Sequence, residues 1–425
     1  MSGGHTLARG GLIMKIQIPE QSLVLLIGPS GSGRSTLAHK HFPPTDVLSG
    51  ADDAEAPLHA EVAGRLSQGR LTVLDDVPFS ADSRKRWAAL AREHHVPLVA
   101  MVLDLPEVLL LERNRLRTGP VPSPRALRNQ WQQLQSALRS LPKEGFKHLH
   151  VLTPETVDAV SFERQPVPGL LPHEHGPFDI IGDIHGCLEE LTALLTKLGY
   201  TVAPRADGAP GFDVGVPTGR RAVFLGDLVD RGPGVTGVLR LVMGMVEAGT
   251  ALCVPGNHEF KLLKKLRGRE MRVSAGLAVT LAQLEREPPE FQQAVADFIE
   301  GRPFQYVLDG GRLVVAHAGL KAAMHGRDST EARDFALYGE TTGEADAYGL
   351  PVRADWAAQY QGAATVVYGH TPVPEAEWIH DTACVDTGCV FGGKLTAVRY
   401  PEREFVSVPA ARAYWETRKS AHEPR

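Results

Sequence analysis

Short apolar runs, each followed by a turn rich in glycine and polar residues, recur along this chain of 425 residues. Runs of this length are typical of buried strands, and stretches with apolar positions at helical spacing lie between and after the first of them. We predict strands at residues 23–27, 71–74 and 98–103 and helices at residues 36–41, 83–93 and 123–141. Because strands and helices alternate, the first part of the chain is expected to form a parallel α/β sheet.

A stretch dense in proline and glycine, residues 165–177, separates this first series from a second one. The second series begins with a predicted strand at 178–181 and a helix at 188–198. Five more strands are predicted at residues 222–225, 251–254, 313–316, 365–368 and 383–385. We therefore expect a first domain over residues 1–164, a linker over 165–177 and a second domain over 178–425, a division that the length allows at roughly 150 residues per domain.

The composition is that of a globular protein and excludes several other classes. Lys and Arg total 45 against 50 Asp and Glu, so the net charge of −5 argues against a protein coated in nucleic acid. With 43% hydrophobic and 22% charged residues, disordered and collagen-like chains are also excluded. The four cysteines form no C-x-x-C pair and are expected to be reduced packing residues. No apolar run approaches the roughly 20 residues of a membrane span, and the first residues lack the core of a secretory signal, so we expect a cytoplasmic protein without membrane association.

In the second part of the chain, turns with metal-binding side chains follow five of the predicted strands. Carboxylate, amide and imidazole groups suit Mn, Fe, Zn or Ni, and loops beyond the carboxyl ends of strands in an α/β sheet can converge on one site. We therefore predict a metal site at this edge of the sheet. The strand at 383–385 is followed by no turn that we recognise as ligand-bearing. The five turns are Gly182-Asp183-Ile184-His185-Gly186, Gly226-Asp227-Leu228-Val229-Asp230-Arg231-Gly232, Gly256-Asn257-His258-Glu259, His317-Ala318-Gly319 and Gly369-His370-Thr371.

These five motifs, in this order, resemble the signature of the binuclear metallophosphoesterase superfamily. The resemblance implies an α/β sandwich that holds two divalent transition metal ions, Mn first and otherwise Ni, Fe or Zn. It also implies that one aspartate bridges the two ions about 3.5 to 4 Å apart, a spacing that suits an in-line phosphoryl displacement. The implied metal ligands are Asp183, His185, Asp227, Asn257, His317 and His370, with Asp227 as the bridge.

The same resemblance implies roles for three further residues. His258 corresponds to the general acid that protonates the leaving group, and Asp230 would orient its imidazole and favour the charged form. Arg231 would bind non-bridging phosphate oxygens, because its planar guanidinium matches two of them at once. Glu259 and Thr371 complete the motifs as supporting residues.

A glycine-rich turn at residues 28–35 follows the first predicted strand and opens a helix, as a phosphate-binding P-loop does. Arg34 stands where the motif expects a lysine, and its bulkier planar group cannot simply replace an ammonium. We therefore expect this loop to bind a nucleotide, for which Mg-ATP is the candidate, with the Ser35 hydroxyl binding the magnesium ion. Efficient turnover of ATP is not expected. The predicted nucleotide-binding residues are Gly28, Gly31, Gly33, Arg34 and Ser35.

Taken together, the P-loop domain and the metal motifs resemble bacterial polynucleotide kinase-phosphatase, an RNA end-healing enzyme. The most specific shared stretches are LYGETTG at 337–343 and DTGCVFGGKL at 386–395. The resemblance implies RNA repair, with removal of 3′-phosphate or 2′,3′-cyclic phosphate from RNA ends beside a 5′-kinase-like domain. Ala51 and Ala54 replace the Asp and Arg of that family's Ser-Ser-Asp-x-x-Arg element, so we expect an impaired kinase. The sequence holds no counterpart of the family's ligase domain, so we expect a separate ligase to seal the ends.

Alternatives stay open for both domains. The same metal centre serves enzymes that cleave dinucleoside tetraphosphates or phosphoproteins, and neither the fold nor the metals separate these substrates. The P-loop domain could instead sense a nucleotide, or dock RNA, without catalysis. The basic stretch at 261–272 is either solvated surface or a contact for an RNA backbone. The same choice, between solvated surface and a lid over ATP phosphates, applies to Arg113, Arg115, Arg117, Arg125 and Arg128.

Overall fold

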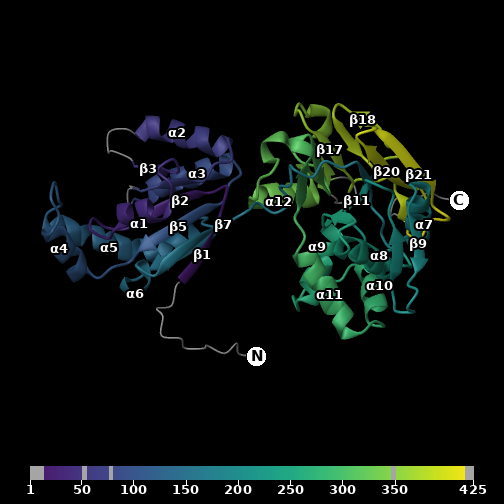
Figure 1. The fold of residues 1–425 in the computed structure, drawn as a ribbon, viewed down its shortest axis with the longest axis horizontal. Helices are drawn as coiled ribbons and strands as arrows, with labels where there is room; N and C mark the ends of the chain where they lie inside the picture. Colours follow the sequence, from purple (N-terminus) through teal and green to yellow (C-terminus); the bar gives the residue numbers. More distant parts are fainter. Residues whose placement is uncertain (1–13, 50–54, 76–79, 346–350, 417–425) are drawn as a thin grey trace. The chain divides into compact units, whose positions relative to one another are not determined.

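The computed structural model describes residues 14–49, 55–75, 80–345 and 351–416, and the chain divides into two compact units (Figure 1). The first unit comprises Met1–Val167 together with Arg327–Ser329. The second comprises Pro168–Gly326 and Thr330–Arg425. Among the helices of the described residues, none combines the length and the apolar character needed to cross a bilayer.

The first unit contains a five-stranded parallel sheet in the order β3-β4-β2-β5-β6, which confirms the predicted parallel α/β arrangement. Its strands are β3 (Val47–Leu48), β4 (Thr72–Leu74), β2 (Leu23–Ile27), β5 (Leu98–Leu103) and β6 (His148–Leu152). The helices of this unit are α1 (Arg34–His41), α2 (Glu55–Ser67), α3 (Ala81–Glu93), α4 (Glu107–Arg115), α5 (Pro124–Ser140) and α6 (Pro154–Val157).

Strand β2 is buried on both faces, which explains its continuous apolar sequence. Val24 and Leu26 pack in a cluster with residues of α1 and α4. Leu23, Leu25 and Ile27 pack in a second cluster with residues of α2 and α3. Successive side chains of a strand point to opposite faces, so a central parallel strand covered on both sides is apolar throughout.

The sequence pattern did not predict the strands at the margin of this unit. Strand β1 (Met14–Pro19) pairs in parallel with β7 (Val160–Gln165) in a separate two-stranded sheet. Ile16 and Ile18 are buried in β1, whereas Lys15 and Gln17 are exposed, so the strand alternates over too few residues to stand out. Gln165, where we expected the linker to begin, is the last residue of β7.

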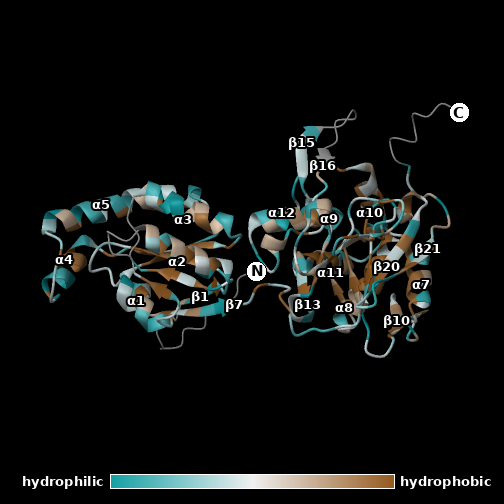
Figure 2. Ribbon diagram, turned by 90° about the horizontal axis from the view of Figure 1, so that it is seen from above, coloured by the Kyte–Doolittle hydropathy of each residue, from teal (hydrophilic) through white to brown (hydrophobic). Residues whose placement is uncertain are grey.

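The second unit is a sandwich of two five-stranded sheets, in the orders β12-β11-β8-β20-β21 and β13-β14-β17-β19-β18. The strands of the first sheet are β8 (Phe178–Ile181), β11 (Arg221–Phe224), β12 (Ala251–Cys253), β20 (Lys394–Tyr400) and β21 (Glu404–Pro409). Those of the second sheet are β13 (Gln305–Leu308), β14 (Leu313–Ala316), β17 (Thr365–Tyr368), β18 (Trp378–Ile379) and β19 (Thr382–Cys384). The expected α/β sandwich is confirmed, and the apolar strands lie inside it (Figure 2).

Helices cover the outer faces of both sheets. One buried cluster joins the first sheet to the helices of this unit that lie between residues 188 and 300. These are α7 (Leu188–Lys197), α8 (Val235–Glu247), α9 (Asn257–Leu266), α10 (Ala275–Leu284) and α11 (Pro289–Glu300). A smaller cluster joins the second sheet to α12 (Thr330–Tyr338). Two hairpins complete the unit, β9 (Thr201–Pro204) with β10 (Phe212–Gly215) and β15 (Thr341–Ala345) with β16 (Pro351–Arg353).

The topology of the sandwich places six strand ends close together. Strands β8, β11 and β12 run parallel in one sheet, and β14, β17 and β19 run parallel in the other. Five of these strands were predicted to lead into metal-binding turns, and β19 was not. The carboxyl ends of parallel strands meet at one edge of their sheet, so this arrangement prepares a site at that edge.

A buried carboxylate ties the first sheet together. Asp179 lies in β8 with none of its surface exposed. It accepts hydrogen bonds from Tyr200 Oη at 3.0 Å, Arg220 Nε at 3.1 Å and Arg399 Nε at 3.3 Å. Burial and the neighbouring carboxylate raise the pKa of Tyr200, so the phenol stays a hydrogen-bond donor. Arg399 belongs to β20, so this group links two neighbouring strands.

We predict that Asp179→Asn lowers the stability of the second unit by about 3 kcal/mol, because the change leaves Arg220 and Arg399 without their buried counter-charge. Thermal unfolding followed by calorimetry measures the effect. The control is Asp207→Asn, which breaks an exposed ion pair with Arg205 and should hardly move the transition. Equal shifts for the two variants would contradict the assignment.

Candidate metal centre

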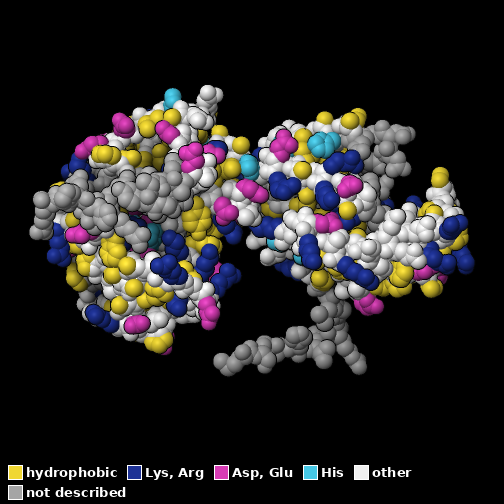
Figure 3. Space-filling model, turned by 180° about the vertical axis from the view of Figure 1, so that it is seen from behind, with side chains coloured by type: hydrophobic (Ala, Val, Ile, Leu, Met, Phe, Trp, Pro, Cys, Tyr) yellow, Lys and Arg dark blue, Asp and Glu magenta, His cyan; other side chains and the backbone are white. Residues whose placement is uncertain are grey.

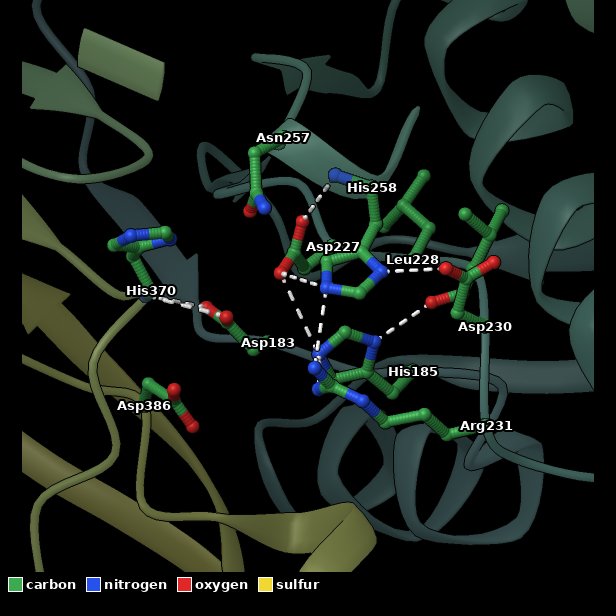
Figure 4. A network of polar contacts seen from close by, with 12 residues as sticks. Asp183, His185, Asp227, Leu228, Asp230, Arg231, Asn257, His258, His370 and Asp386 are labelled. Carbon is green, nitrogen blue, oxygen red and sulfur yellow. Dashed lines mark hydrogen bonds and ion pairs between the residues drawn. The ribbon is translucent and has the colours of Figure 1, made fainter. Parts of the chain in front are cut away.

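The predicted metal-binding side chains meet at the carboxyl ends of the sandwich strands (Figure 4). His185 Nε2 lies 3.4 Å from Asp227 Oδ2, and His317 Nε2 lies 3.5 Å from Asp227 Oδ1. His317 Nε2 also lies 3.1 Å from Asn257 Oδ1 and 3.0 Å from His370 Nδ1. These five residues come from five separate turns, and their ligand atoms now face one another.

Two groups of donor atoms share Asp227. One consists of His185, Asp227 and His258, and the other of Asp227, His317 and His370. Within each group the ligand atoms lie within 4.8 Å of one another. Because Asp227 points one oxygen toward each group, the arrangement fits two cations bridged by this carboxylate.

Backbone carbonyl groups hold the imidazoles of His185 and His317 through Nδ1, the ring nitrogen that faces away from the centre. His185 Nδ1 lies 2.7 Å from the Val229 carbonyl oxygen, and His317 Nδ1 lies 2.9 Å from that of Leu225. A protonated Nδ1 on each ring leaves the Nε2 lone pair directed at the centre, as metal-binding histidines require. His370 Nε2 is buried without a hydrogen-bond partner, which marks it as a donor atom available to a cation.

Burial and charge set the protonation states that metal binding needs. Burial lowers the pKa of His370 to about 3, with a further contribution from His317, and burial also lowers the pKa of His185 and His317. Burial alone would raise the pKa of Asp227, but the surrounding imidazoles outweigh it and hold the pKa well below its usual range. Neutral imidazoles and an ionised carboxylate are the forms that bind divalent cations.

Asp183 approaches the centre from the end of β8. Both of its oxygens lie 3.2 Å from the His370 backbone nitrogen, which donates to them. The Asp183 oxygen would lie 2.1 Å from a Cβ atom on Gly369, so only glycine leaves room for the carboxylate. Burial raises the pKa of Asp183, and the carboxylates of Asp386 and Asp227 raise it further. Clustered buried carboxylates of this kind favour a bound cation.

Asp386 is a site residue that the sequence reasoning missed. We recognised no ligand-bearing turn after the predicted strand at 383–385, but Asp386 lies two residues after the end of β19 and beside Asp183 (Figure 4). It is 5% exposed, and burial raises its pKa to about 7. The signal was the one used for the other turns, a polar residue directly after an apolar strand. Asp386 therefore adds a sixth strand end to the centre.

The predicted general acid and its partners form a connected chain. His258 Nδ1 lies 2.5 Å from Asp230 Oδ2, and Arg231 Nη2 donates to His258 Nε2 at 3.1 Å. Thr280 of α10 donates to Asp230 Oδ1 at 2.7 Å and accepts from the Asp230 backbone nitrogen. Arg231 Nη1 also lies 2.5 Å from His185 Nε2. The structure thus brings His258, Asp230 and Arg231 together next to the metal-binding groups, while their catalytic roles stay predictions.

Glu259 supports two of the turns at once. Its carboxylate accepts hydrogen bonds from the backbone nitrogens of Asp227 at 2.7 Å, Leu228 at 2.8 Å and Val229 at 3.1 Å. It also accepts one from Gly256 at 2.7 Å, at the start of α9. Four amides on one buried carboxylate fix the loop that carries Asp227, which makes Glu259 a positioning residue. Thr371, the other expected support, lines a neighbouring cavity instead.

Several site residues hold unfavourable backbone conformations. The φ angles are positive at His185 (46°), Asp227 (45°), Asp230 (73°), Arg231 (71°) and His370 (72°). Each such residue costs on the order of 1 to 3 kcal/mol and persists only where the surroundings fix it. Strain gathered on the predicted ligands and their neighbours is typical of a functional site.

Comparisons with known proteins agree with this geometry. The calcineurin-like phosphoesterase family matches residues 176–386. The chain is 46% identical over 245 residues to bis(5'-nucleosyl)-tetraphosphatase PrpE (asymmetrical) of Bacillus subtilis (strain 168), which spans 57% of this chain and 98% of that protein. The chain belongs to the calcineurin-like phosphoesterase family. Divalent metal ions are therefore implied at this centre of the phosphoesterase, and the donor set fits them.

Further relatives of this phosphoesterase match a similar share of the chain. The protein of the same name from Geobacillus thermodenitrificans (strain NG80-2) is 47% identical over 240 residues, covering 55% of this chain and 94% of that protein. A solved structure whose description names a diadenosine tetraphosphatase is 27% identical, covers 57% of this chain and 96% of that one, and has a TM-score of 0.42. In the first unit, an AAA domain matches residues 23–141.

The AAA-domain match contains the predicted phosphate loop between β2 and α1. Gly31 and Gly33 adopt φ angles of 80° and 96°, so the loop turns as a P-loop requires. The loop borders a cavity of about 440 Å³, lined by residues that include Gly31, Gly33, Arg34 and Ser35. Gly28, the remaining predicted residue, opens the loop, and a Cβ there would meet Ser32 Oγ at 2.5 Å. Residues 51–54, which carry the departures from the kinase element, lie outside the described residues.

Some of the basic residues singled out in the sequence lie at the phosphate loop, and others form surface ion pairs. Arg113 and Arg117 line the cavity at the phosphate loop, and Arg117 Nη1 donates to Ser30 Oγ at 3.0 Å. Arg128 pairs with Glu107 at 2.8 Å, and Arg267 pairs with Asp297 and Glu300 at 2.5 Å each, as ordinary surface residues do. On the face shown in Figure 3, Lys and Arg side chains are interspersed with Asp and Glu.

The four cysteines are buried and form no disulfide. Two of them, Cys187 and Cys389, lie next to Glu190. Each follows a site residue closely in the sequence, Cys187 after His185 and Cys389 after Asp386. The Cys187 thiol and burial raise the pKa of Cys389. Glu190 Oε1 accepts from Tyr414 Oη at 2.8 Å, so this cluster anchors a carboxyl-terminal segment against α7.

We predict that Glu259→Gln lowers metal affinity and hydrolysis by about 10- to 100-fold, because an amide cannot accept from all four backbone nitrogens. Elemental analysis of bound metal and turnover of a chromogenic phosphate ester measure the two effects. Glu285→Gln, at an exposed glutamate, is the matched control and should leave both unchanged. Wild-type metal content in Glu259→Gln would show that the carboxylate is not needed to position Asp227.

Proposed function

We propose that the second unit hydrolyses dinucleoside tetraphosphates asymmetrically, releasing a nucleoside triphosphate and a nucleoside monophosphate. The observation that carries this proposal is the pair of donor groups sharing Asp227, in a chain that aligns with 98% of a bis(5'-nucleosyl)-tetraphosphatase. Hydrolysis by a metallophosphoesterase follows from family membership, whereas the substrate rests on the names of the relatives.

These names favour the tetraphosphatase alternative over the RNA-end phosphatase that the sequence resemblance implied. RNA 3′-phosphate and 2′,3′-cyclic phosphate ends, RNA repair and a partner ligase stay predictions of that resemblance. The metal centre itself does not choose between these substrates, because phosphomonoesters and phosphoanhydrides present similar phosphate oxygens.

The geometry supports a division of labour among the side chains. Two divalent ions bound at the centre would act as Lewis acids on the phosphate and on the attacking water. The residues that would hold these ions are Asp227, His185, His317, His370, Asn257 and Asp183, with Asp386 beside Asp183. Arg231, which reaches both His185 and His258, would bind non-bridging phosphate oxygens. His258 would donate a proton from Nε2 to the leaving phosphate oxygen, while Asp230 at Nδ1 holds the ring in place.

The test compares substrates on the full chain supplied with Mn²⁺. We expect the highest kcat/KM for diadenosine tetraphosphate, with ATP and AMP as products, compared with RNA carrying a 3′-phosphate or 2′,3′-cyclic phosphate and with a phosphopeptide. Asp227→Asn should lose activity on the order of 10²-fold or more, because the shared carboxylate is removed. Faster turnover of RNA ends or of the phosphopeptide would overturn the substrate assignment.

We also propose that the first unit binds the phosphates of a nucleoside triphosphate at the loop 28–35. The cavity there and the arginines that line it support this role. Arg34→Ala should weaken Mg-ATP binding by about 10- to 150-fold, because a charge-assisted hydrogen bond contributes roughly 1.5 to 3 kcal/mol. Isothermal titration calorimetry measures the affinity, and Arg34→Lys should retain it. Arg125→Ala, outside the lining of the cavity, is the control, and unchanged ATP binding in Arg34→Ala would contradict the assignment.

Kinase activity is a separate question from ATP binding. With labelled ATP and 5′-hydroxyl RNA, in an Asp183→Ala background that prevents dephosphorylation, we expect no robust transfer of label. Transfer at a high rate would refute the impaired-kinase prediction. Binding without transfer would favour a nucleotide-sensing unit.

A further inference from the structure

A cavity of about 300 Å³ lies beside the metal centre, within the second unit. His370 and Thr371 line it, so it borders the turn that carries a predicted metal ligand. The rest of the lining includes three aromatic residues, Tyr338, Trp356 and Tyr368, and one cation, Arg353. None of these four has a role in the proposed hydrolysis at the metals.

The rings of Tyr338, Trp356 and Tyr368 form an aromatic wall, and Tyr368 lies on the strand that leads to the predicted metal ligand His370. Tyr368 is the last residue of β17, and His370 follows it by two positions. The centroid of the Tyr368 ring lies 5.0 Å from that of Trp356. Because His370 and these rings line the same cavity, a substrate with a phosphate at His370 would present its next group to the rings.

Trp356 is held in one place by its neighbours. A Cβ atom on Gly319 would lie 1.9 Å from the indole ring, so the ring packs directly on the His317-Ala318-Gly319 turn. Phe335 packs edge-on against the indole with centroids 5.9 Å apart, and Trp356 is only 7% exposed. A rigid aromatic wall gives a flat ligand a surface to pack on at little entropic cost.

Positive charge stands next to the aromatic wall. Arg353 is anchored because Nη1 donates to the carbonyl oxygen of Tyr338. Two carboxylates also line the cavity: Glu340 forms an ion pair with Lys321 at 2.7 Å, and Asp355 accepts a hydrogen bond from the Ala358 backbone nitrogen at 3.1 Å. An aromatic surface beside an arginine matches a base or nucleoside joined to phosphate, since arginine binds phosphate oxygens in a planar fork.

We propose that this cavity is a nucleoside subsite, in which the base of one substrate nucleotide packs against Trp356 while Arg353 contacts its phosphate. The proposal rests on the proposed function, because it assigns part of the same substrate. A cavity of about 300 Å³ is at the lower end of ligand pockets, so it takes one nucleoside. The second nucleoside of a dinucleotide would remain outside it.

The first test measures binding rather than turnover. The full chain, with and without Mn²⁺, is titrated calorimetrically with AMP and with inorganic phosphate. Wild-type protein should bind AMP at least tenfold more tightly than phosphate. Trp356→Leu and Arg353→Gln should each lose most of this preference, and Trp356→Phe should keep most of it. AMP bound at the phosphate loop is recognised because Arg34→Ala, and not Trp356→Leu, removes it.

Trp378→Leu is the matched control. Trp378 lies in β18, packs against Phe405 and lines no part of the cavity. It should leave the preference for AMP unchanged. If Trp356→Leu fails to fold, Arg353→Gln carries the test, because Arg353 is exposed and contributes little to the core. Unchanged AMP binding in Arg353→Gln and in whichever Trp356 variants fold would overturn the subsite.

The second test separates the subsite from the proposed function. Trp356→Leu and Arg353→Gln should each lower kcat/KM for diadenosine tetraphosphate at least tenfold more than they lower kcat/KM for p-nitrophenyl phosphate, which carries no nucleoside. If the wild type does not cleave the tetraphosphate but still prefers AMP through Trp356, the proposed function fails and the nucleoside subsite stands. If the tetraphosphate is cleaved equally well by wild type and variants, the subsite fails and the function stands.

Discussion

The hydrogen bonds from four backbone amides to the Glu259 carboxylate are the constraint on which the metal centre depends. They join the start of α9 to the turn after β11, and they hold Asp227 in a left-handed conformation that is uncommon for residues other than glycine. Burial raises the pKa of Glu259 to about 7, with Asp227 adding to the shift, so this carboxylate is itself held at a cost. Hydrogen bonds to four amides offset that cost.

Asp227 in turn organises the charges around it. Four imidazoles surround it and favour its ionised form, although burial opposes this. Burial of His185, His317 and His370 lowers the pKa of each imidazole, which favours the neutral form that binds a cation. On the far side, Asp183 and Asp386 stand close together with raised pKa values. Carboxylates so placed repel each other when ionised, and bound divalent cations would relieve this repulsion.

The sequence was sufficient to predict most of this centre, because each ligand follows a short apolar strand. That rule located the five turns, and the family resemblance implied which of their residues bind metal. The structure brings these side chains together: Asp183, His185, Asp227, Asn257, His317 and His370. The rule missed Asp386, although this aspartate also follows an apolar strand, because its turn matches none of the five motifs of the family signature. It also could not find Thr280, which reaches Asp230 from α10 across 50 positions of sequence. Contacts of that kind depend on tertiary packing, which local pattern does not encode.

The marginal and antiparallel strands of the sheets were harder to predict, because they too depend on tertiary packing. Central strands such as β2 are buried on both faces and stand out as apolar runs, whereas β1 and β7 are half exposed and mix polar with apolar residues. The antiparallel strands β13, β18, β20 and β21 were likewise not assigned, because no chemically distinctive turn follows them. Sequence patterns therefore identify the strands that carry the site better than the strands that complete the sheets.

Substrate choice has to lie outside the metal centre. The motif residues bind phosphate oxygens and metals, which phosphoanhydrides and phosphomonoesters have in common. What distinguishes a dinucleotide is the nucleoside attached to its phosphates, and the aromatic cavity beside His370 is lined by groups that can recognise one. The proposed asymmetrical reaction would also release a nucleoside triphosphate, the class of ligand for which the loop 28–35 of the first unit has the right form. On this view both units recognise nucleotides, and the proposed hydrolysis in the second unit would produce a ligand for the first.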